Sequence, residues 1–218
     1  MKTNSLLRSA ALVIGLIGFS AVSFADSITY STSVGTQPSD VGAITLTQVN
    51  ATTVKVLLDL KPGYGILNTG GPHTPFAFNL AHEDNLSISF VQPSGGTYTI
   101  GSHIYLFSLN TGGGANTPYG TFGVAIDDSA PNGGSKAYYG DFEFNLSRTG
   151  GLTLADFVPN SVSDGAWFFS ADLVSPIGAT GAQAWKTKDT PQVPDSGATA
   201  ILLGVGLLSL SLVRRKSA

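Results

Sequence analysis

The chain has 218 residues, of which charged residues make up only 11%, against roughly 25% in a typical soluble globular domain. Its 27 glycines and 11 prolines outnumber the 25 charged residues, a balance that excludes a basic nucleic-acid binder and favours loop-rich β structure. No cysteine is present, which excludes disulfides, thiol nucleophiles and thiolate metal sites.

The first 25 residues have the three parts of a secretory signal peptide. Lys2 and Arg8 are its only charges, an apolar run covers residues 10–19, and the small residues Ser23 and Ala25 occupy the positions that a signal peptidase reads. The alternative is an uncleaved membrane anchor, but about ten apolar residues are too few for the roughly 20 that span a bilayer. We therefore predict export and cleavage before Asp26.

Residues 26–190 are predicted to form the exported domain, and period-two alternation is their main pattern. The clearest case is residues 52–60, where Val54 and Val56 share one face with two leucines and Lys55 lies on the other. Similar apolar faces are Ile28 and Tyr30; Leu86, Ile88 and Phe90; Phe142, Phe144 and Leu146; and Trp167, Phe169, Ala171 and Leu173. Shorter apolar runs cover residues 75–80, 104–109 and 122–126.

Turn residues separate these runs, with Gly, Asn and Pro clustered between each pair. The only helical suggestion, residues 153–157, is too short to build on. Nine or ten short strands divided in this way predict an all-β fold, an antiparallel β-sandwich or jelly-roll-like domain.

The exported domain is acidic, with six Lys and Arg residues against thirteen Asp and Glu, a net charge of −7. This charge disfavours nucleic acid and anionic lipid as partners. It is compatible with divalent cations or with neutral glycans such as extracellular polysaccharide. We expect no cofactor.

Two groups of residues that contain Asp and Glu are candidates for a functional site. His82, Glu83 and Asp84 have side chains suited to a metal, but the second histidine of a zinc-protease HExxH motif is missing, and a solvated turn is the simpler interpretation. The second group, Asp127 and Asp128 with Asp141 and Glu143, could supply oxygen ligands for calcium.

No calcium-loop motif surrounds the second group, and Asp141 and Glu143 fit the outward face of a strand. The alternative function is a secreted glycan-active enzyme, whose two carboxylates would have to face each other across a cleft. A calcium- or carbohydrate-binding module on the same fold is a further alternative.

Aromatic residues could offer flat faces to sugar rings, or could fill the core. The residues concerned are Tyr64, Tyr105, Tyr119, Tyr138, Tyr139, Trp167 and Trp185. We expect most of them, and Trp167 above all, in the core. Because neighbouring strand residues face opposite sides, one ring of the Tyr138–Tyr139 pair should be exposed if the other is buried.

Nucleophile motifs are absent: the sequence has no G-x-S-x-G elbow, no S-x-x-K pair and no P-loop. We therefore expect a protein without enzymatic activity.

The C-terminal 28 residues, 191–218, have three parts of their own. The motif Val193, Pro194, Asp195, Ser196 and Gly197 is followed by an uncharged stretch to residue 213 and then by Arg214, Arg215 and Lys216. Residues 197–213 would form a helix of about 26 Å, slightly short for a hydrocarbon layer of about 30 Å. Three cations behind such a transmembrane helix would stop translocation and stay on the cytoplasmic side.

Prolines 191 and 194 favour an extended backbone, the form in which a protease binds its substrate. The alternative is that Asp195 or Ser196 caps the helix and the prolines end a linker. A sortase tail has the same layout, but Val193 and Ser196 stand where it has Leu and Thr. A lipid-anchor signal requires a polar spacer of about 8–12 residues that is missing here.

Together, the motif of residues 193–197, the Gly- and Leu-rich span, the basic terminus and the N-terminal signal resemble the exosortase substrates. These are bacterial proteins with a PEP-CTERM-type sorting tail, and the closest variety is VPDSG-CTERM. The resemblance implies export through signal peptidase and the export machinery, followed by a precursor held in the bacterial inner membrane. It further implies recognition of residues 193–197 by an exosortase, removal of the tail, and a final place at the cell surface or outside the cell.

Overall fold

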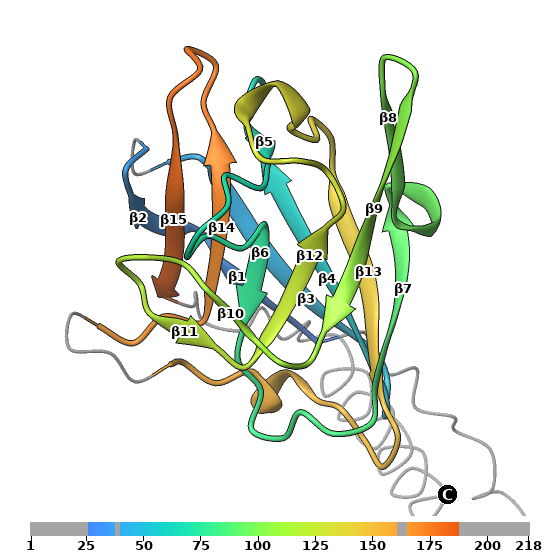
Figure 1. Cartoon of the computed structure of the whole chain (residues 1–218). Coiled ribbons are helices and arrows are strands. Elements are labelled where there is room, and N and C mark those ends of the chain that lie inside the picture. Colours follow the sequence, from blue (N-terminus) through green and yellow to red (C-terminus); the bar gives the residue numbers. More distant parts are fainter. Residues whose placement is uncertain (1–25, 38–39, 161–164, 188–218) are drawn as a thin grey trace, which may run out of the picture. The chain divides into compact units, whose positions relative to one another are not determined.

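The described part of the chain is built entirely from β-strands and short 3-10 turns (Figure 1). The structure is a computed structural model and describes residues 26–37, 40–160 and 165–187. Every strand pairing in this part is antiparallel, which confirms the predicted all-β class. The predicted helical turn at residues 153–157 is the 3-10 helix η4, Leu154–Asp156.

Fifteen strands lie within the described residues, more than the nine or ten predicted. They are β1 Ser27–Tyr30, β2 Thr32–Gly35, β3 Gly42–Asn50, β4 Thr53–Leu60, β5 Gly65–Ile66, β6 Phe76–Phe78, β7 Leu86–Gln92, β8 Thr97–Ile100, β9 His103–Asn110, β10 Gly114–Ala115, β11 Thr121–Phe122, β12 Val124–Asp128, β13 Phe142–Arg148, β14 Phe169–Val174 and β15 Thr180–Thr187. Two further 3-10 helices are η2 Ser94–Gly96 and η3 Gly134–Lys136.

The first sheet has five strands in the order β1-β3-β4-β13-β7. Its central strand β4 follows the predicted alternation, since Val54, Val56 and Leu58 are fully buried while Asp59 on the opposite face is exposed. The strand has this pattern because one face of the sheet meets the core and the other meets solvent.

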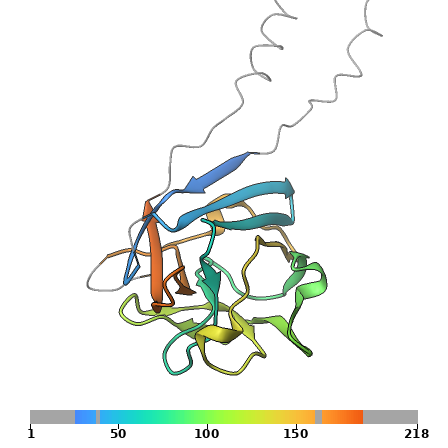
Figure 2. The same ribbon diagram turned by 90° about the horizontal axis from the view of Figure 1, so that it is seen from above.

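The second sheet runs β2-β15-β14-β6-β12-β9-β8, with the short β5 also paired to β14. Seen from above, the blue strands of the first sheet form a layer apart from the green strands of the second (Figure 2). The chain passes between the sheets through short connections, among them Ser31 between β1 and β2 and the 3-10 helix η2 between β7 and β8.

The core lies between the two sheets and is rich in phenylalanine. Phe76 of the second sheet contacts Phe142 and Phe144 of the first, with ring centroids 5.7 and 6.1 Å apart. It also stacks against Phe169 of its own sheet at 6.1 Å. Two antiparallel sheets that share one core in this way form the two layers of a sandwich.

Six strands had no counterpart among the predictions: β2, β3, β5, β8, β10 and β15. The buried face of β3 was overlooked, although Ile44 and Leu46 are fully buried there. In β15, Ala182, Gln183, Ala184 and Trp185 are all buried, so its sequence shows no apolar and polar alternation. Strand β14 is likewise buried along its whole length.

Strands β6, β14 and β15 of the second sheet are buried on both faces because a segment of the chain covers their outer side. We call residues 114–122, which carry β10 and β11, the flap. Its Tyr119 and Phe122 form a second apolar cluster with Ala77, Trp167, Ala182 and Ala184. The backbone of Gly114 lies so close to Ala125 that a Cβ atom there would be 2.9 Å from the alanine methyl. Small side chains on the outer face thus permit the flap to lie close to the sheet.

One strand prediction requires correction. Trp167 does not continue the face of Phe169, Ala171 and Leu173, because β14 begins only at Phe169. The Trp167 ring is 4% exposed, but it packs edge-on against Tyr119 of the flap at 5.0 Å and not in the core between the sheets.

Within these same three ranges of described residues, no helix is long and apolar enough to cross a membrane. The predicted transmembrane helix at residues 197–213 and the predicted signal peptide at residues 1–25 both lie outside them.

Candidate functional site

The residues of the predicted sorting tail lie outside the described residues, as do those of the signal cleavage site. They are Val193, Pro194, Asp195, Ser196 and Gly197, the cations Arg214, Arg215 and Lys216, and the cleavage residues Ser23 and Ala25. The described residues nearest to these segments are Asp26 and Thr187.

At the N-terminal end, the fold begins directly after the predicted cleavage site. The Asp26 carbonyl accepts a hydrogen bond from the Gln48 amide at 2.9 Å, and β1 starts at the next residue. At the C-terminal end, β15 stops at Thr187, which pairs with Thr32 of β2. Five residues, 188–192, separate this last strand position from Val193.

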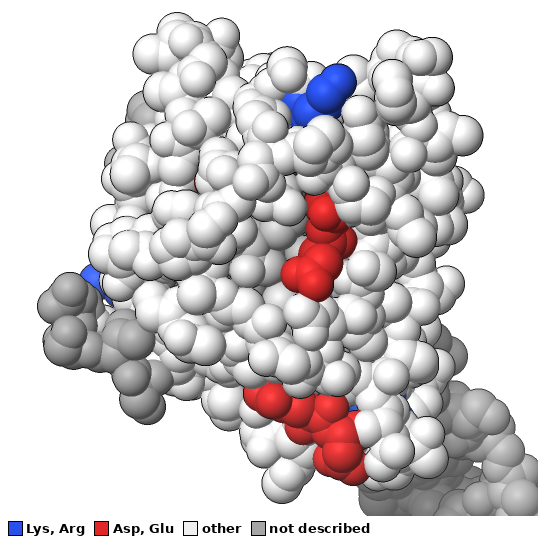
Figure 3. Space-filling model, in the orientation of Figure 1, with Lys and Arg blue, Asp and Glu red and all other residues white. Residues whose placement is uncertain are grey.

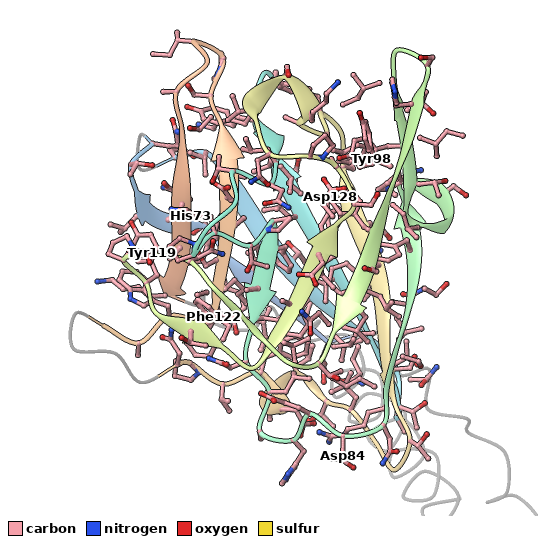
Figure 4. All side chains as sticks on the ribbon, in the orientation of Figure 1. His73, Asp84, Tyr98, Tyr119, Phe122 and Asp128 are labelled. Carbon is pink, nitrogen blue, oxygen red and sulfur yellow. The ribbon has the colours of Figure 1, made fainter. Side chains whose placement is uncertain are left out.

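The triplet His82, Glu83 and Asp84 lies in the turn that leads into β7, as the simpler interpretation predicted. His82 and Asp84 are exposed, and the Asp84 carboxylate accepts a hydrogen bond from the Asn85 side chain at 2.9 Å. Glu83 is half-buried against Gly123, whose missing side chain leaves room for the carboxylate. Figure 4 shows Asp84 at the edge of the domain, far from the other labelled residues.

The four candidate calcium ligands are not brought together. Asp127 and Asp128 lie on β12 in the second sheet, whereas Glu143 lies on β13 in the first. Glu143 forms an ion pair with Lys55 at 3.3 Å on the neighbouring strand, and Asp141 is exposed. Across the part of the chain that the structure describes, no group of three or more His, Asp or Glu side chains is arranged to hold a metal ion.

Asp127 and Asp128 already have partners, on opposite faces of β12. Asp127 accepts a hydrogen bond from the Asn110 side chain at 2.8 Å. Asp128 points inward, where it accepts a hydrogen bond from the Tyr98 hydroxyl and another from the Ala130 amide at 2.9 Å. Figure 4 shows Tyr98 and Asp128 close together.

Burial dominates the electrostatics of this Tyr98–Asp128 pair. Desolvation raises the pKa of Asp128, although the hydrogen bonds from Tyr98 and Ala130 oppose it. Desolvation, followed by the hydrogen bond and the charge of Asp128, raises the pKa of the Tyr98 phenol far above its usual value. The pair therefore has a packing role in which the carboxylate oxygens are already occupied.

Most of the aromatic residues are buried, as expected. Tyr105, Tyr119, Trp167 and Trp185 are at most 7% exposed. The prediction for Tyr138 and Tyr139 is confirmed: Tyr138 packs on the core against Tyr98 at 5.3 Å, whereas Tyr139 is 58% exposed. One exposed ring is a poor platform for a polysaccharide chain.

Charges are sparse on the face that carries the flap. In the space-filling view, acidic side chains gather at two places and most of the surface is neutral (Figure 3). This face offers no dense acidic surface for cations.

A polar cluster that was not predicted from the sequence is formed by Thr69, His73 and Asp172. Asp172 of β14 is fully buried, and its Oδ2 accepts hydrogen bonds from the Thr69 amide at 2.8 Å and from the Thr69 hydroxyl. Its Oδ1 and the Nδ1 of His73 are both buried without a hydrogen-bond partner. Figure 4 shows His73 on the same side of the domain as Tyr119 and Phe122.

Burial raises the pKa of the Asp172 carboxyl, while the Thr69 hydrogen bonds and the charge of His73 act against this shift. One signal for the cluster was present in the sequence: Asp172 is the only charged residue in the otherwise uncharged run of residues 165–174. A charge inside a fully buried strand requires a partner.

Comparison with known proteins identifies the tail. Residues 192–217 match the model of the VPDSG-CTERM motif, which confirms the resemblance stated for the tail. No curated protein and no solved structure matches the chain significantly. The motif supports an exported protein that is sorted by an exosortase.

Proposed function

We propose that this chain is a non-enzymatic exported protein, held as a precursor in the bacterial inner membrane and released from its tail by an exosortase. The N-terminal signal opens translocation and is removed before Asp26. The apolar stretch of residues 197–213 halts translocation, with Arg214, Arg215 and Lys216 on the cytoplasmic side. The β domain then serves at the cell surface or in the extracellular polysaccharide.

The match of residues 192–217 to the VPDSG-CTERM motif carries this proposal. Five residues, 188–192, lie in the sequence between Thr187, the last described residue of β15, and Val193. Six Cα steps separate these two residues, a reach of at most about 20 Å when extended. A processing enzyme at the membrane surface could bind residues 193–197 without unpairing β15.

Substitution of the motif tests the proposal in the producing bacterium. Pro194→Ala and Asp195→Asn should leave export intact and block tail removal, seen as a membrane-bound species heavier by the mass of the retained tail. Matched controls lie in the same linker: Pro191→Ala and Asp189→Asn make the same chemical changes outside the motif and should be processed normally. Normal processing of the Pro194 and Asp195 variants would contradict recognition of the motif.

A further inference from the structure

Strand β7 forms one edge of the first sheet, at the margin of the described domain (Figure 1). It pairs with β13 on one side, and its other side forms no backbone hydrogen bond with a described residue. The edge strands β1, β2 and β8 have four residues each, whereas β7 has seven. Among the described residues, β7 is therefore the longest strand at the edge of a sheet.

The pairing with β13 determines which backbone groups of β7 face outward. The Thr149 amide donates to the Asn85 carbonyl at 3.4 Å, so these two residues form a hydrogen-bonded pair of the antiparallel ladder. Because such pairs alternate with non-hydrogen-bonded pairs, Ser87 and Ser89 direct their backbone groups toward β13. The N–H and C=O groups of Ile88, and those of the residues two positions before and after it, therefore face the free edge.

The core-facing side chains of β7 are incompletely covered. Leu86, Ile88 and Phe90 pack against the core, but all three are partly exposed. At the opposite edge of the same sheet, Ile28 and Tyr30 of β1 are buried, with 8% and 1% exposed. A further strand beside β7 would thus remove apolar surface from water and also pair the outward backbone groups.

Strand β7 lacks the features that usually protect an edge strand, which are charged residues, proline, bulges and short length. Residues 85–126, which include β7, contain no Asp, Glu, Lys or Arg, and β7 itself contains no proline. Its register with β13 is irregular only at its end, between Glu143 and Phe144. On an acidic domain, such an uncharged edge is a place where two copies can meet without placing like charges in contact.

From these observations we propose that β7 is a self-association edge, at which the β7 strand of a second copy pairs in antiparallel orientation about a two-fold axis. The register centred on Ser89 pairs all seven residues of the strand, with Leu86 opposite Gln92 of the second copy. In this register, each residue lies opposite one that is an even number of positions away. Because residues two apart share a face, the apolar faces of the two strands coincide.

The same register also matches the outward backbone groups. Ile88 lies opposite Phe90 of the second copy, and both residues direct their N–H and C=O groups toward the free edge, so they can exchange the hydrogen bonds of an antiparallel pair. The two-fold axis repeats this pair. The acidic turn that contains Glu83 and Asp84 precedes β7, so the turns of the two copies lie at opposite ends of the paired strands. The first sheets of the two copies then form one continuous sheet.

The lack of native cysteine allows this register to be tested by disulfide cross-linking of the full-length chain in mild detergent. Ser89→Cys places one thiol of each copy beside the two-fold axis, in a non-hydrogen-bonded pair whose Cα atoms are about 4.5 Å apart, within reach of a disulfide. Ser87→Cys is the matched control, because it makes the same change at an exposed position on the same face. Its two Cα atoms would be about 14 Å apart, too far for a disulfide.

With copper phenanthroline as oxidant, Ser89→Cys should form a disulfide-linked dimer at least about tenfold faster than Ser87→Cys, since only the first pair is close enough. Ser87→Cys chains mixed with tagged Val91→Cys chains should form the heterodimer, although each variant alone should cross-link slowly, because these two positions lie opposite each other. Adding Ser87→Lys and Val91→Lys to Ser89→Cys places like charges opposite each other and should slow its cross-linking to the rate of the control.

Equal rates for Ser89→Cys and Ser87→Cys would overturn the proposal, because the copies would then meet only by collision or through another part of the chain. Failure of the Ser87→Cys and Val91→Cys mixture to form the heterodimer would overturn the register. A Ser89→Cys rate that the two added lysines leave unchanged would show that β7 is not the contact. Because the unprocessed chain is used, none of these outcomes depends on removal of the tail.

Discussion

At the scale of single residues, the described fold depends on buried charges that have specific partners. Arg148 is the clearest example, since it ties three segments together. Its Nε donates to the Gly151 carbonyl at 2.6 Å, its Nη1 to the His82 carbonyl at 3.0 Å, and its Nη2 to Asp156 at 2.9 Å. Both side chains of the ion pair are largely buried, with 11% and 15% exposed. A largely buried, hydrogen-bonded ion pair of this kind stabilises the fold more than an ion pair in water does.

We predict that Asp156→Asn lowers the free energy of unfolding at pH 7 by about 1.5–3 kcal/mol, the range for a hydrogen bond to a charged group. Burial by itself raises the pKa of Asp156, but hydrogen bonds from Thr153 and Arg148 outweigh it and hold the pKa below its usual range. A carboxyl group whose pKa is depressed in the folded state stabilises the fold when the pH is above its unfolded-state pKa of about 4. This stabilisation is lost as the pH falls through the folded-state pKa.

Urea unfolding of the Asp156→Asn variant and the parent chain from pH 7 to pH 3 checks this expectation. The difference between the two proteins should shrink below about pH 4. The control Asp84→Asn, in an exposed turn, should change stability by no more than about 0.5 kcal/mol at any pH. A difference that stays constant down to pH 3 would show that Asp156 acts through packing and not through its charge.

At the scale of elements, the two sheets are joined by contacts between rings. Phe76 is the centre of this packing, because its ring contacts Phe78 and Phe169 in its own sheet and Phe142 and Phe144 in the other. Strand β6 has only three residues, so its place in the sheet depends on such contacts more than on its few backbone hydrogen bonds.

We expect Phe76→Ala to cost about 3–5 kcal/mol of unfolding free energy, because it leaves a cavity between two sheets that cannot close around it. Equilibrium unfolding in urea measures the loss. Leu106→Ala on β9, where the native side chain is 45% exposed, should cost less than about 1 kcal/mol. Equal costs for the two variants would mean that the rings do not hold the sheets together.

The individual strands show how much of this fold could be predicted from the sequence. Strand β4 was predicted well because it has one face in the core and one in solvent. Strands β14 and β15 were respectively misplaced and missed, since the flap buries their outer face and no alternation remains. That covering comes from residues about 60 positions away, which local patterns do not reveal. Asp172 was missed for the same reason, since its hydrogen-bond partner Thr69 belongs to a distant loop.

The tail could be predicted because its signal is contiguous. Residues 193–197, the apolar stretch and the three cations follow one another directly, and no tertiary contact is needed to recognise them. The candidate calcium ligands are the opposite case, because a metal site requires side chains that the fold brings together. Asp128 and Glu143 lie near other acidic residues in the sequence, but the fold places them on different sheets.

At the scale of the whole molecule, five residues, 188–192, lie between Thr187, the last described residue of β15, and the sorting motif. Deleting residues 188–190 would leave three Cα steps between Thr187 and Val193, about 10 Å. We predict that this deletion blocks tail removal, because the folded domain would then obstruct the processing enzyme.

Replacing the same three residues by Gly-Ser-Gly keeps the length and should leave processing normal. Immunoblots of membrane and extracellular fractions distinguish the two outcomes. Normal processing of the deletion variant would mean that the enzyme reaches the motif despite the short tether, or that β15 unpairs to supply the missing length.

The central claim is that residues 193–218 are a sorting signal and not a working part of the β domain. Mass spectrometry of the C-terminus of the protein recovered from the surface of the producing bacterium tests it most directly. We predict a C-terminus within or next to residues 193–197, with residues 198–218 absent. A surface protein that still ends at Ala218 would contradict the account.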